Sequence, residues 1–401
     1  MGEVRGPLVG LAAVLLGACA APGPVRPTLT EAELLAGAPL PSAVDAAPPI
    51  TAAEATELDT DMRTFVAKSV GPATDPHYKL ERLFDGMRRD GLFRLVYSGI
   101  ETRPATVTFR ERRGNCLSFT MMFVALAREA GLAVKYQVVD VPPQWTSDNE
   151  LVVVRSHINA VVRTGYDRTT LVDFNLFDAK AKYSRRSVDD AYVLGLFYAN
   201  VGAEALIDKD YELAFRYLRE SARAAPELPA AWINLGALYS RLHAYDYAES
   251  AYLRALAAVP NNPSAATNLV RLYTTLGEDA LAEVYRQRVR HYQDANPYYH
   301  YALAQRFYED GSFDAALGEL RRAQRLKRDE QDFYLLQARA LLELGRLDAA
   351  ADALDRGREY AQPADARAEY DAQAEAVLSG RVTPAPEPVL PEQAANADQA
   401  H

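Results

Sequence analysis

The chain has 401 residues, of which 49% are hydrophobic and 24% charged, and 54 acidic side chains outnumber 44 basic ones to give a formal net charge of −10. This is the balance of an ordinary globular protein, so it excludes wholesale disorder, a collagen-like fibre and a multi-span membrane protein. The acidic excess argues against a general nucleic-acid binder, which uses basic patches to displace counterions from phosphates, and no nucleic-acid partner is expected.

The N-terminus has the pattern of an export signal. After Arg5 comes an apolar run, Leu8–Leu16, which is too short to span a bilayer because spanning takes roughly 20 apolar residues. The run ends in the tetrapeptide LGAC, which resembles the lipobox of bacterial lipoproteins. By that resemblance residues 1–18 are a signal peptide and Cys19 is lipidated, which anchors the chain in the cell envelope, at the outer membrane facing the periplasm. The alternative is an ordinary secretory signal with a chance cysteine.

Two segments are rich in Ala and Pro and offer little apolar surface for a core. They are residues 19–50, which follow the signal, and residues 381–401 at the C-terminal end. Such compositions are typical of tethers, because they cannot bury enough apolar surface to offset the entropy of ordering. Both segments are predicted to be disordered.

Residues 51–190 have the pattern of an α+β domain. A mostly helical stretch over 51–110 leads to the motif GNC, whose cysteine is Cys116. An apolar-periodic helix follows and stops at Gly131, so the thiol stands at or just before a helix N-terminus that Asn115 or Ser118 can cap. The dipole and the unpaired N–H groups of a helix N-terminus favour a thiolate there.

Three strand-like runs follow the helix, over residues 133–141, 151–163 and 170–174. The second run contains His157 and the third contains Asp173. A cysteine on a helix is thus followed by a histidine and an aspartate on successive strands.

This order resembles the transglutaminase-like core, a branch of the papain-like cysteine enzymes, over about residues 100–180. The matching pieces are GNC ending at Cys116, SHINAV containing His157, and VD ending at Asp173. The resemblance implies a papain-like α+β fold in which Cys116 is the nucleophile, His157 the base and Asp173 the acid that orients it. It implies no cofactor and no metal.

The chemistry of these three residue types supports the same roles. A free thiol is mostly protonated at neutral pH, and a neighbouring imidazole can take its proton to form a thiolate–imidazolium pair. A carboxylate on the other ring nitrogen fixes the tautomer and orientation of the imidazole. The thiolate attacks an amide carbonyl to give a thioester, which water hydrolyses or an amine aminolyses.

Each of the three residues also has a plainer interpretation. Cys116 can be a small buried hydrophobic residue, His157 a hydrogen-bonded strand histidine, and Asp173 a strand-end residue facing water. A zinc site is disfavoured because no second cysteine lies nearby. The helix N-terminus can supply one oxyanion donor, whereas the second stays open among Tyr136, Gln137 and Trp145.

Residues 195–364 repeat with a period of 34 residues, in five frames without an insertion that begin at residues 195, 229, 263, 297 and 331. Position 20 is alanine in every frame, whereas Lys209 at position 15 and Arg286 at position 24 depart from the pattern. The period resembles the tetratricopeptide repeat, which implies an all-α solenoid of paired helices. Residues 365–380 are predicted to be a capping helix with a polar outer face.

The resemblance also implies a concave face that binds a peptide or protein partner. Tyrosines with nearby arginines make a plausible groove, because Tyr offers a rigid apolar body with a polar tip. The alternative is that the tyrosines pack against the next repeat. The candidate binding residues are Arg271, Tyr298, Tyr301, Gln305, Tyr308 and Arg339.

Together these patterns predict a lipid-anchored envelope protein with a cysteine domain followed by a solenoid. The favoured function is hydrolysis or transfer of amide bonds in a peptide or protein that the repeats recruit, that is, a cysteine peptidase, amidase or transglutaminase-type acyl transferase. The competing hypothesis is a non-enzymatic adaptor in which the repeats bind a partner and the cysteine domain is a folded spacer or a peptide clamp. The state of Cys116 discriminates the two.

Overall fold

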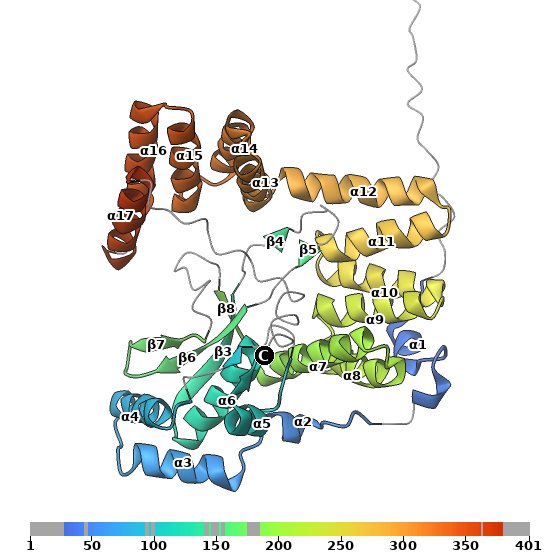
Figure 1. Ribbon diagram of the computed structural model, residues 1–401. Helices are drawn as coiled ribbons and strands as arrows, with labels where there is room; N and C mark the ends of the chain where they lie inside the picture. The colour runs from blue at the N-terminus through green and yellow to red at the C-terminus, as the bar shows by residue number, and fades with distance from the viewer. Residues whose placement is uncertain are drawn as a thin grey trace, which may run out of the picture.

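The computed structural model describes residues 28–43, 47–92, 96–97, 101–139, 144–145, 152–153, 157–174, 185–361 and 364–379. Within them an α+β domain is followed by a solenoid of paired helices (Figure 1). The expected signal peptide, Cys19 and the tail 381–401 lie outside these residues. No helix in the described part of the chain has the length and apolar character needed to cross a membrane.

Residues 28–43 are ordered against the solenoid, which corrects the expectation that 19–50 is a disordered tether. They contain α1 (Glu31–Ala36) and the short 3-10 helix η1 (Pro41–Ala43). A capping box starts α1, and Leu34 is buried in the core of the first repeats. The Leu29 N–H donates to Ser250 Oγ at 2.9 Å. The composition is that of a linker, but its few leucines pack against the apolar cluster of the first repeats.

The helices of the cysteine domain surround one central helix. Four helices come first, α2 (Ala52–Thr56), α3 (Thr60–Val70), α4 (Pro76–Arg89) and α5 (Ala105–Glu111). The central helix is α6 (Cys116–Glu129), in which every residue from Leu117 to Ala127 is buried. A helix that is apolar on all sides has to be enclosed, and α6 is covered by the sheet on one side and by other helices elsewhere.

A four-stranded antiparallel sheet completes the domain, in the order β7-β6-β3-β8. Its strands are β3 (Ala133–Val139), β6 (His157–Arg163), β7 (Thr169–Val172) and β8 (Arg185–Val188). Two small ladders accompany it, the parallel pair β1 (Val96–Tyr97) with β2 (Arg113–Gly114) and the antiparallel pair β4 (Gln144–Trp145) with β5 (Val152–Val153). The sequence gives no sign of β8, because its residues RRSV are mostly polar and the strand lies at a sheet edge.

The solenoid keeps the 34-residue period in its helices. The first helices of the five repeats are α7 (Asp190–Ile207), α9 (Pro229–Arg241), α11 (Pro263–Thr275), α13 (Pro297–Glu309) and α15 (Gln331–Glu343). The second helices are α8 (Tyr211–Ala224), α10 (Tyr245–Ala258), α12 (Asp279–Asp294), α14 (Phe313–Leu326) and α16 (Leu347–Tyr360), and α17 (Ala364–Leu378) follows. The stack arcs from α7, beside α6, round to α17, and the β4–β5 pair lies inside the arc against α11 and α13 (Figure 1).

The small residues of the repeat mark the places where paired helices approach each other. The alanines at position 20 are fully buried in all five repeats, namely Ala214, Ala248, Ala282, Ala316 and Ala350. At position 8 of the second repeat, a Cβ on Gly236 would lie 2.4 Å from the ring of Tyr252. These positions are small because a neighbouring helix occupies the space that a larger side chain needs.

The first repeat shares its hydrophobic core with the cysteine domain. Helix α7 begins at Asp190, before the first expected frame, and its Val193, Leu196 and Phe197 pack in one cluster with Met122 of α6. The predicted boundary between residues 190 and 195 therefore does not separate two cores. The rest of the solenoid has two further clusters, one through Tyr285 of α12 and one that starts at α13.

Candidate active site

Cys116 is the first residue of α6, where the cap holds it. Asn115 is extended, and its Oδ1 accepts the Ser118 N–H at 3.0 Å, so Asn115 is the cap and Ser118 is its partner. The Asn115 Nδ2 donates to Thr102 Oγ1 at 2.7 Å, which fixes the amide orientation. The thiol itself is half-buried and forms no disulfide. As predicted, it stands at the positive end of a helix dipole.

The strand register brings His157 and Asp173 together. Ala160 on β6 pairs with Val172 on β7, so the next pair along the ladder is Asn159 with Asp173. His157 is then the diagonal neighbour of Asp173, a separation that long side chains bridge. The His157 Nε2 lies 2.7 Å from one Asp173 carboxylate oxygen and 2.8 Å from the other. The Asn159 Nδ2 donates to the same carboxylate at 3.3 Å.

The imidazole of His157 lies between a carboxylate and a thiol. Its side chain is 3% exposed, and burial alone lowers its pKa. Hydrogen bonds and charge interactions with Asp173 and then Cys116 outweigh burial and raise the pKa of His157 to about 9. Asp173 occupies Nε2, and the buried Nδ1 has no well-aligned hydrogen bond within the described part of the chain. Nδ1 is thus the ring nitrogen available to the Cys116 thiol.

The three predicted catalytic residues are therefore neighbours in the fold, each held by a different element. Helix α6 supplies Cys116, strand β6 supplies His157, and the residue after β7 supplies Asp173. Asn159 was not predicted, although its place two residues after His157 puts it on the same face of the strand. No group of three or more side chains suited to metal binding occurs among the described residues.

The three candidates for the second oxyanion donor lie in different surroundings. Tyr136 is 3% exposed and stacks under Arg128 in the last turn of α6, at the opposite end from Cys116. Gln137 pairs with Asn159 across the ladder, on the strand face that carries His157, and its buried Oε1 has no partner in the described part of the structure. The side chain of Trp145 is outside the described residues. The register thus favours Gln137 over Tyr136.

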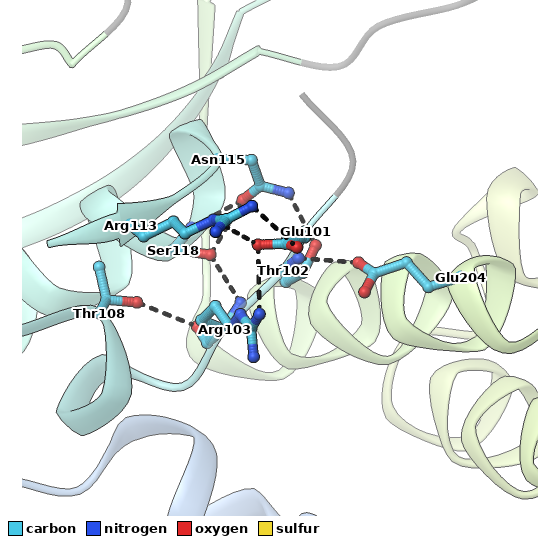
Figure 2. A network of polar contacts seen from close by, with 8 residues as sticks. All are labelled: Glu101, Thr102, Arg103, Thr108, Arg113, Asn115, Ser118 and Glu204. Atoms are coloured by element: carbon cyan, nitrogen blue, oxygen red, sulfur yellow. Dashed lines mark hydrogen bonds and ion pairs between the residues drawn. The ribbon is translucent and has the colours of Figure 1, made fainter. Parts of the chain in front are cut away.

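A polar network that the sequence patterns do not predict supports the start of α6 (Figure 2). The Arg103 N–H donates to Ser118 Oγ at 2.8 Å, and the Thr102 N–H donates to Glu204 Oε1 at 2.7 Å. Glu101 pairs with the guanidinium groups of Arg103 and Arg113. Glu204 belongs to α7, so a residue of the solenoid is linked to the start of α6 through Thr102. No spacing in the sequence links positions this far apart.

The tyrosines predicted to line a groove contact the next repeat. Tyr298 donates its hydroxyl to Glu330 Oε2 at 3.0 Å, and its ring meets Phe333 edge-on. The rings of Tyr301 and Phe333 have centroids 5.1 Å apart. Tyr308 donates to Glu343 Oε1 at 3.4 Å. These contacts are those of the alternative interpretation, in which the tyrosines join repeats, although each ring stays partly accessible.

The remaining three candidate binding residues differ in exposure. Arg271 is exposed on α11, whereas Gln305 on α13 is half-buried. Arg339 is half-buried on α15; burial raises the pKa values of Tyr301 and Tyr308, and the nearby charge of Arg339 opposes that rise. Its buried Nε has no hydrogen-bond partner among the described residues. A role of these residues in binding stays a prediction.

Comparison with known families agrees with this geometry. Residues 63–170 match the model of the transglutaminase-like superfamily. They form a transglutaminase-like domain. The matched range includes Cys116 and His157, and Asp173 lies just after its end. No curated protein matches the chain.

Three of the solved structures that match the chain each cover less than half of it. MamA from Desulfovibrio magneticus RS-1 is 20% identical over 42% of this chain and 94% of its own, with a TM-score of 0.24. MamA AMB-1 is 23% identical over 43% and 92%, with a TM-score of 0.23. YrrB, described as a TPR protein with an unusual peptide-binding site, is 16% identical over 44% and 92%, with a TM-score of 0.24. The helix pairs of residues 190–360 are themselves repeats of the tetratricopeptide type.

Proposed function

We propose that the transglutaminase-like domain hydrolyses or transfers amide bonds of a peptide or protein, with Cys116 as nucleophile. One observation carries the proposal, the buried His157 ring that Asp173 holds by Nε2 while Cys116 adjoins the ring as well. A structural histidine needs one hydrogen-bond partner, whereas a catalytic base needs an orienting group on one nitrogen and a nucleophile on the other.

The arrangement supports the following steps. With its Nε2–H directed to Asp173, the neutral ring has its lone pair on Nδ1, which takes the proton of the Cys116 thiol. A pKa of about 9 keeps the imidazolium form at neutral pH, the state that stabilises a thiolate. The sulfur attacks the amide carbonyl, the imidazolium returns the proton to the departing amine, and a thioester remains. Water or a second amine then attacks the thioester and releases Cys116.

The helix N-terminus contributes to charge stabilisation in these steps. The first N–H groups of α6 have no intrahelical partner, and Asn115 takes up only that of Ser118. A carbonyl that is attacked by Cys116 develops its negative charge near the positive end of α6, where such groups stabilise an oxyanion. Gln137 is the candidate for the second donor, because it shares the strand face of His157.

Alkylation of Cys116 by iodoacetamide tests the proposal without a known substrate. A chain that starts after Cys19 has Cys116 as its single cysteine, so the label reports one site. We expect His157→Ala to lower the alkylation rate constant at pH 7 by roughly tenfold or more, because the imidazolium that stabilises the thiolate is gone. His291→Ala, at an exposed position of α12, is the matched control. Equal rates in wild type and His157→Ala would contradict the proposal.

The type of acyl transfer needs a separate readout. A peptide library incubated with hydroxylamine would capture the acyl group as a hydroxamate, which identifies the substrates. Incorporation of a fluorescent amine in competition with hydrolysis then separates transfer from peptidase activity. The Cys116→Ser variant should give neither product.

We further propose that the repeats recruit the substrate or a partner. The support is the position of the β4–β5 ladder, an insertion of the cysteine domain that lies against α11 and α13, the helices of Arg271 and Tyr301 (Figure 1). A peptide held along these helices would be near that domain. Loss of peptide binding in Arg339→Ala, measured by fluorescence anisotropy on a bound library member, would support recruitment; unchanged affinity for each member would count against it.

An adaptor without catalysis is the second candidate, and one observation favours it. The cysteine domain covers the apolar side of the first repeat, and solenoids need such a cap. An adaptor of this kind keeps its partner, and its phenotype in cells, when Cys116 is changed to Ser. An enzyme keeps the partner and loses the phenotype.

Envelope attachment through Cys19 is proposed from the sequence alone. The support is the short apolar run and the LGAC motif before the cysteine. Labelling of cells with radioactive palmitate should mark the wild-type chain and leave Cys19→Ser unmarked. Fractionation of the labelled protein into outer and inner membranes then tests its location, with outer membrane as the expected result.

A further inference from the structure

A chain of hydrogen bonds connects the solenoid to the start of α6 (Figure 2). The Glu204 carboxylate accepts the Thr102 backbone N–H at 2.7 Å, and a hydrogen bond from the Thr102 hydroxyl also acts on its pKa. The Thr102 Oγ1 accepts the Asn115 Nδ2 at 2.7 Å, and the Asn115 Oδ1 accepts the Ser118 N–H at 3.0 Å. The donor and the acceptor of each of these hydrogen bonds are thus defined.

The middle of this chain is closed to water. Thr102 is 5% exposed, Asn115 is 6% exposed and Ser118 is fully buried. Water cannot replace a lost partner at such positions, so breaking one bond leaves a buried polar group unsatisfied. The Arg103 N–H holds Ser118 from the other side at 2.8 Å. Residues 101–103 are therefore clamped between α7 and α6.

We propose that Glu204 of the first repeat is a positioning residue for Cys116. It fixes Thr102, Thr102 fixes the amide of Asn115, and Asn115 sets the first turn of α6 that carries the thiol. The inference rests on the proposed function in taking Cys116 as the nucleophile. It extends that function, because the solenoid then helps to position the Cys116 thiol in addition to binding a substrate or partner.

The surroundings of Glu204 make this series of hydrogen bonds, the relay from Glu204 through Thr102 to Asn115, dependent on pH. Burial raises the pKa of Glu204 to about 7, against the hydrogen bonds from Thr102 and the charge of Arg103, which lower it, and with the charge of Glu101, which raises it. Tyr217 of α8 faces the carboxylate from the solenoid side. Glu204 thus changes charge near neutral pH, and Glu204→Gln imitates its protonated form.

The test is the iodoacetamide rate constant of Cys116 from about pH 5 to 9, measured in the chain that starts after Cys19. We expect Glu204→Ala to lower it roughly tenfold, the order that corresponds to the loss of one hydrogen bond to a charged group. Glu204→Gln should remove an inflection near pH 7 that the wild type shows. Glu220→Gln is the matched control, because Glu220 lies on α8 of the same repeat and pairs with Arg219 and Arg223, outside the hydrogen bonds that lead to Asn115.

A double-mutant cycle decides whether the effect passes through Thr102. Thr102→Val removes the hydroxyl and keeps the backbone N–H. If both residues act in one relay, the double variant with Glu204→Ala should be little slower than the slower single variant, whereas independent effects multiply.

Three results would overturn the inference: Glu204→Ala within twofold of wild type, an equal loss in Glu220→Gln, or multiplied effects in the double variant. If Glu204→Ala does not fold by circular dichroism, Thr102→Val decides by the same twofold criterion, and Glu204→Gln decides by whether the inflection near pH 7 disappears; an inflection that persists would overturn the inference. The proposed function fails separately, when His157→Ala leaves alkylation unchanged.

Discussion

His157 is a buried histidine with the Asp173 carboxylate on one side and the Cys116 thiol beside it. His157 is nearly inaccessible, and its pKa is raised from 6.5 to about 9 because Asp173 and Cys116 together outweigh burial. A pKa that differs between the folded and unfolded states makes stability depend on pH. The electrostatics of the candidate site therefore affect folding as well as chemistry.

Stability should fall in alkali through this residue. Since the folded pKa lies above the unfolded one, His157 contributes stability that is fully present below about pH 6.5 and is lost as pH rises through about 9. The contribution is roughly 3 kcal/mol at most, from about 1.4 kcal/mol per pKa unit. Urea unfolding at several pH values between 6 and 10 measures it.

The control for that prediction is His157→Asn, which keeps a polar side chain but does not titrate. Its free energy of unfolding should lack the alkaline decline that the wild type shows between about pH 7 and 9. A decline of the same size in both proteins would assign the effect to other groups.

The sequence was sufficient to predict the three candidate catalytic residues that the fold brings together, but not the residues that support them. Cys116, His157 and Asp173 are of rare or reactive types, and they occur in the order of a known fold. Asn159 and Glu204 are common residue types whose partners are set by strand register and by helix packing. Nothing local in the sequence distinguishes them from surface residues.

The helix pairs of the solenoid all turn with a left-handed residue at position 15. Gly277, Gly311 and Gly345 fill it in the last three repeats, with φ between 68° and 74°. Lys209 and His243 fill it in the first two, with φ of 65° and 57°. The departure at Lys209 is thus a side chain in a conformation that costs an L-residue about 1 kcal/mol.

Replacing Lys209 by glycine should stabilise the protein. We expect Lys209→Gly to raise the free energy of unfolding by about 0.5–1 kcal/mol, because glycine adopts this conformation without a steric penalty. Lys209→Ala tests whether loss of the charge is responsible, and it should give no such gain. Chemical denaturation of the three proteins measures the difference.

The other departure, Arg286, lies where the solenoid core divides. Position 24 is leucine or tyrosine in the other repeats and buried there, whereas Arg286 is half-exposed and pairs with Glu283. On α12 only Ala282 and Tyr285 are buried. The apolar cluster of the first three repeats ends at this helix, and a separate one begins at α13.

Restoring the repeat pattern at position 24 should make the two apolar clusters of the solenoid continuous. Arg286→Leu is expected to raise the midpoint of unfolding of repeats four and five, since it adds apolar surface where the clusters are interrupted. Hydrogen exchange followed by mass spectrometry shows this as slower exchange in α13 and α14. Arg290→Leu, one turn further on the same helix and also paired with Glu283, is the control, and equal protection in both variants would remove the explanation.

At the scale of the whole molecule, the cysteine domain and the first repeat form one folding unit. Val193, Leu196 and Phe197 of α7 are buried with the helices of the cysteine domain. Exposing such side chains costs about 1.5–3 kcal/mol each, which is a large part of the 5–15 kcal/mol that stabilises a typical domain.

A fragment that stops before α7 should therefore not fold. We expect residues 20–189 to lack a cooperative thermal transition, whereas residues 20–260, which include two repeats, should keep one. Circular dichroism and differential scanning calorimetry distinguish the two. A fragment 20–189 that melts at the temperature of the longer one would show that α7 is dispensable.

The sequence predicted the two kinds of domain better than the places where the segments of the chain pack against each other. The 34-residue period determines the solenoid because the same burial pattern recurs five times, as the alanines from Ala214 to Ala350 show. The boundary near residue 190 was inferred from where the first 34-residue frame begins, and the disorder of 19–50 was inferred from composition. Both were affected by tertiary packing, since α7 enters the neighbouring core and Leu34 enters the solenoid.

The docking of residues 28–43 on the solenoid also sets a distance. Leu29, whose backbone N–H is hydrogen-bonded to Ser250, lies ten residue steps after Cys19, and ten steps of fully extended chain reach at most about 35 Å. With a lipid on Cys19, as proposed, the second repeat stays within that reach of the bilayer, a distance close to the diameter of a small domain. A protein held in this way meets partners close to the membrane surface rather than throughout the compartment.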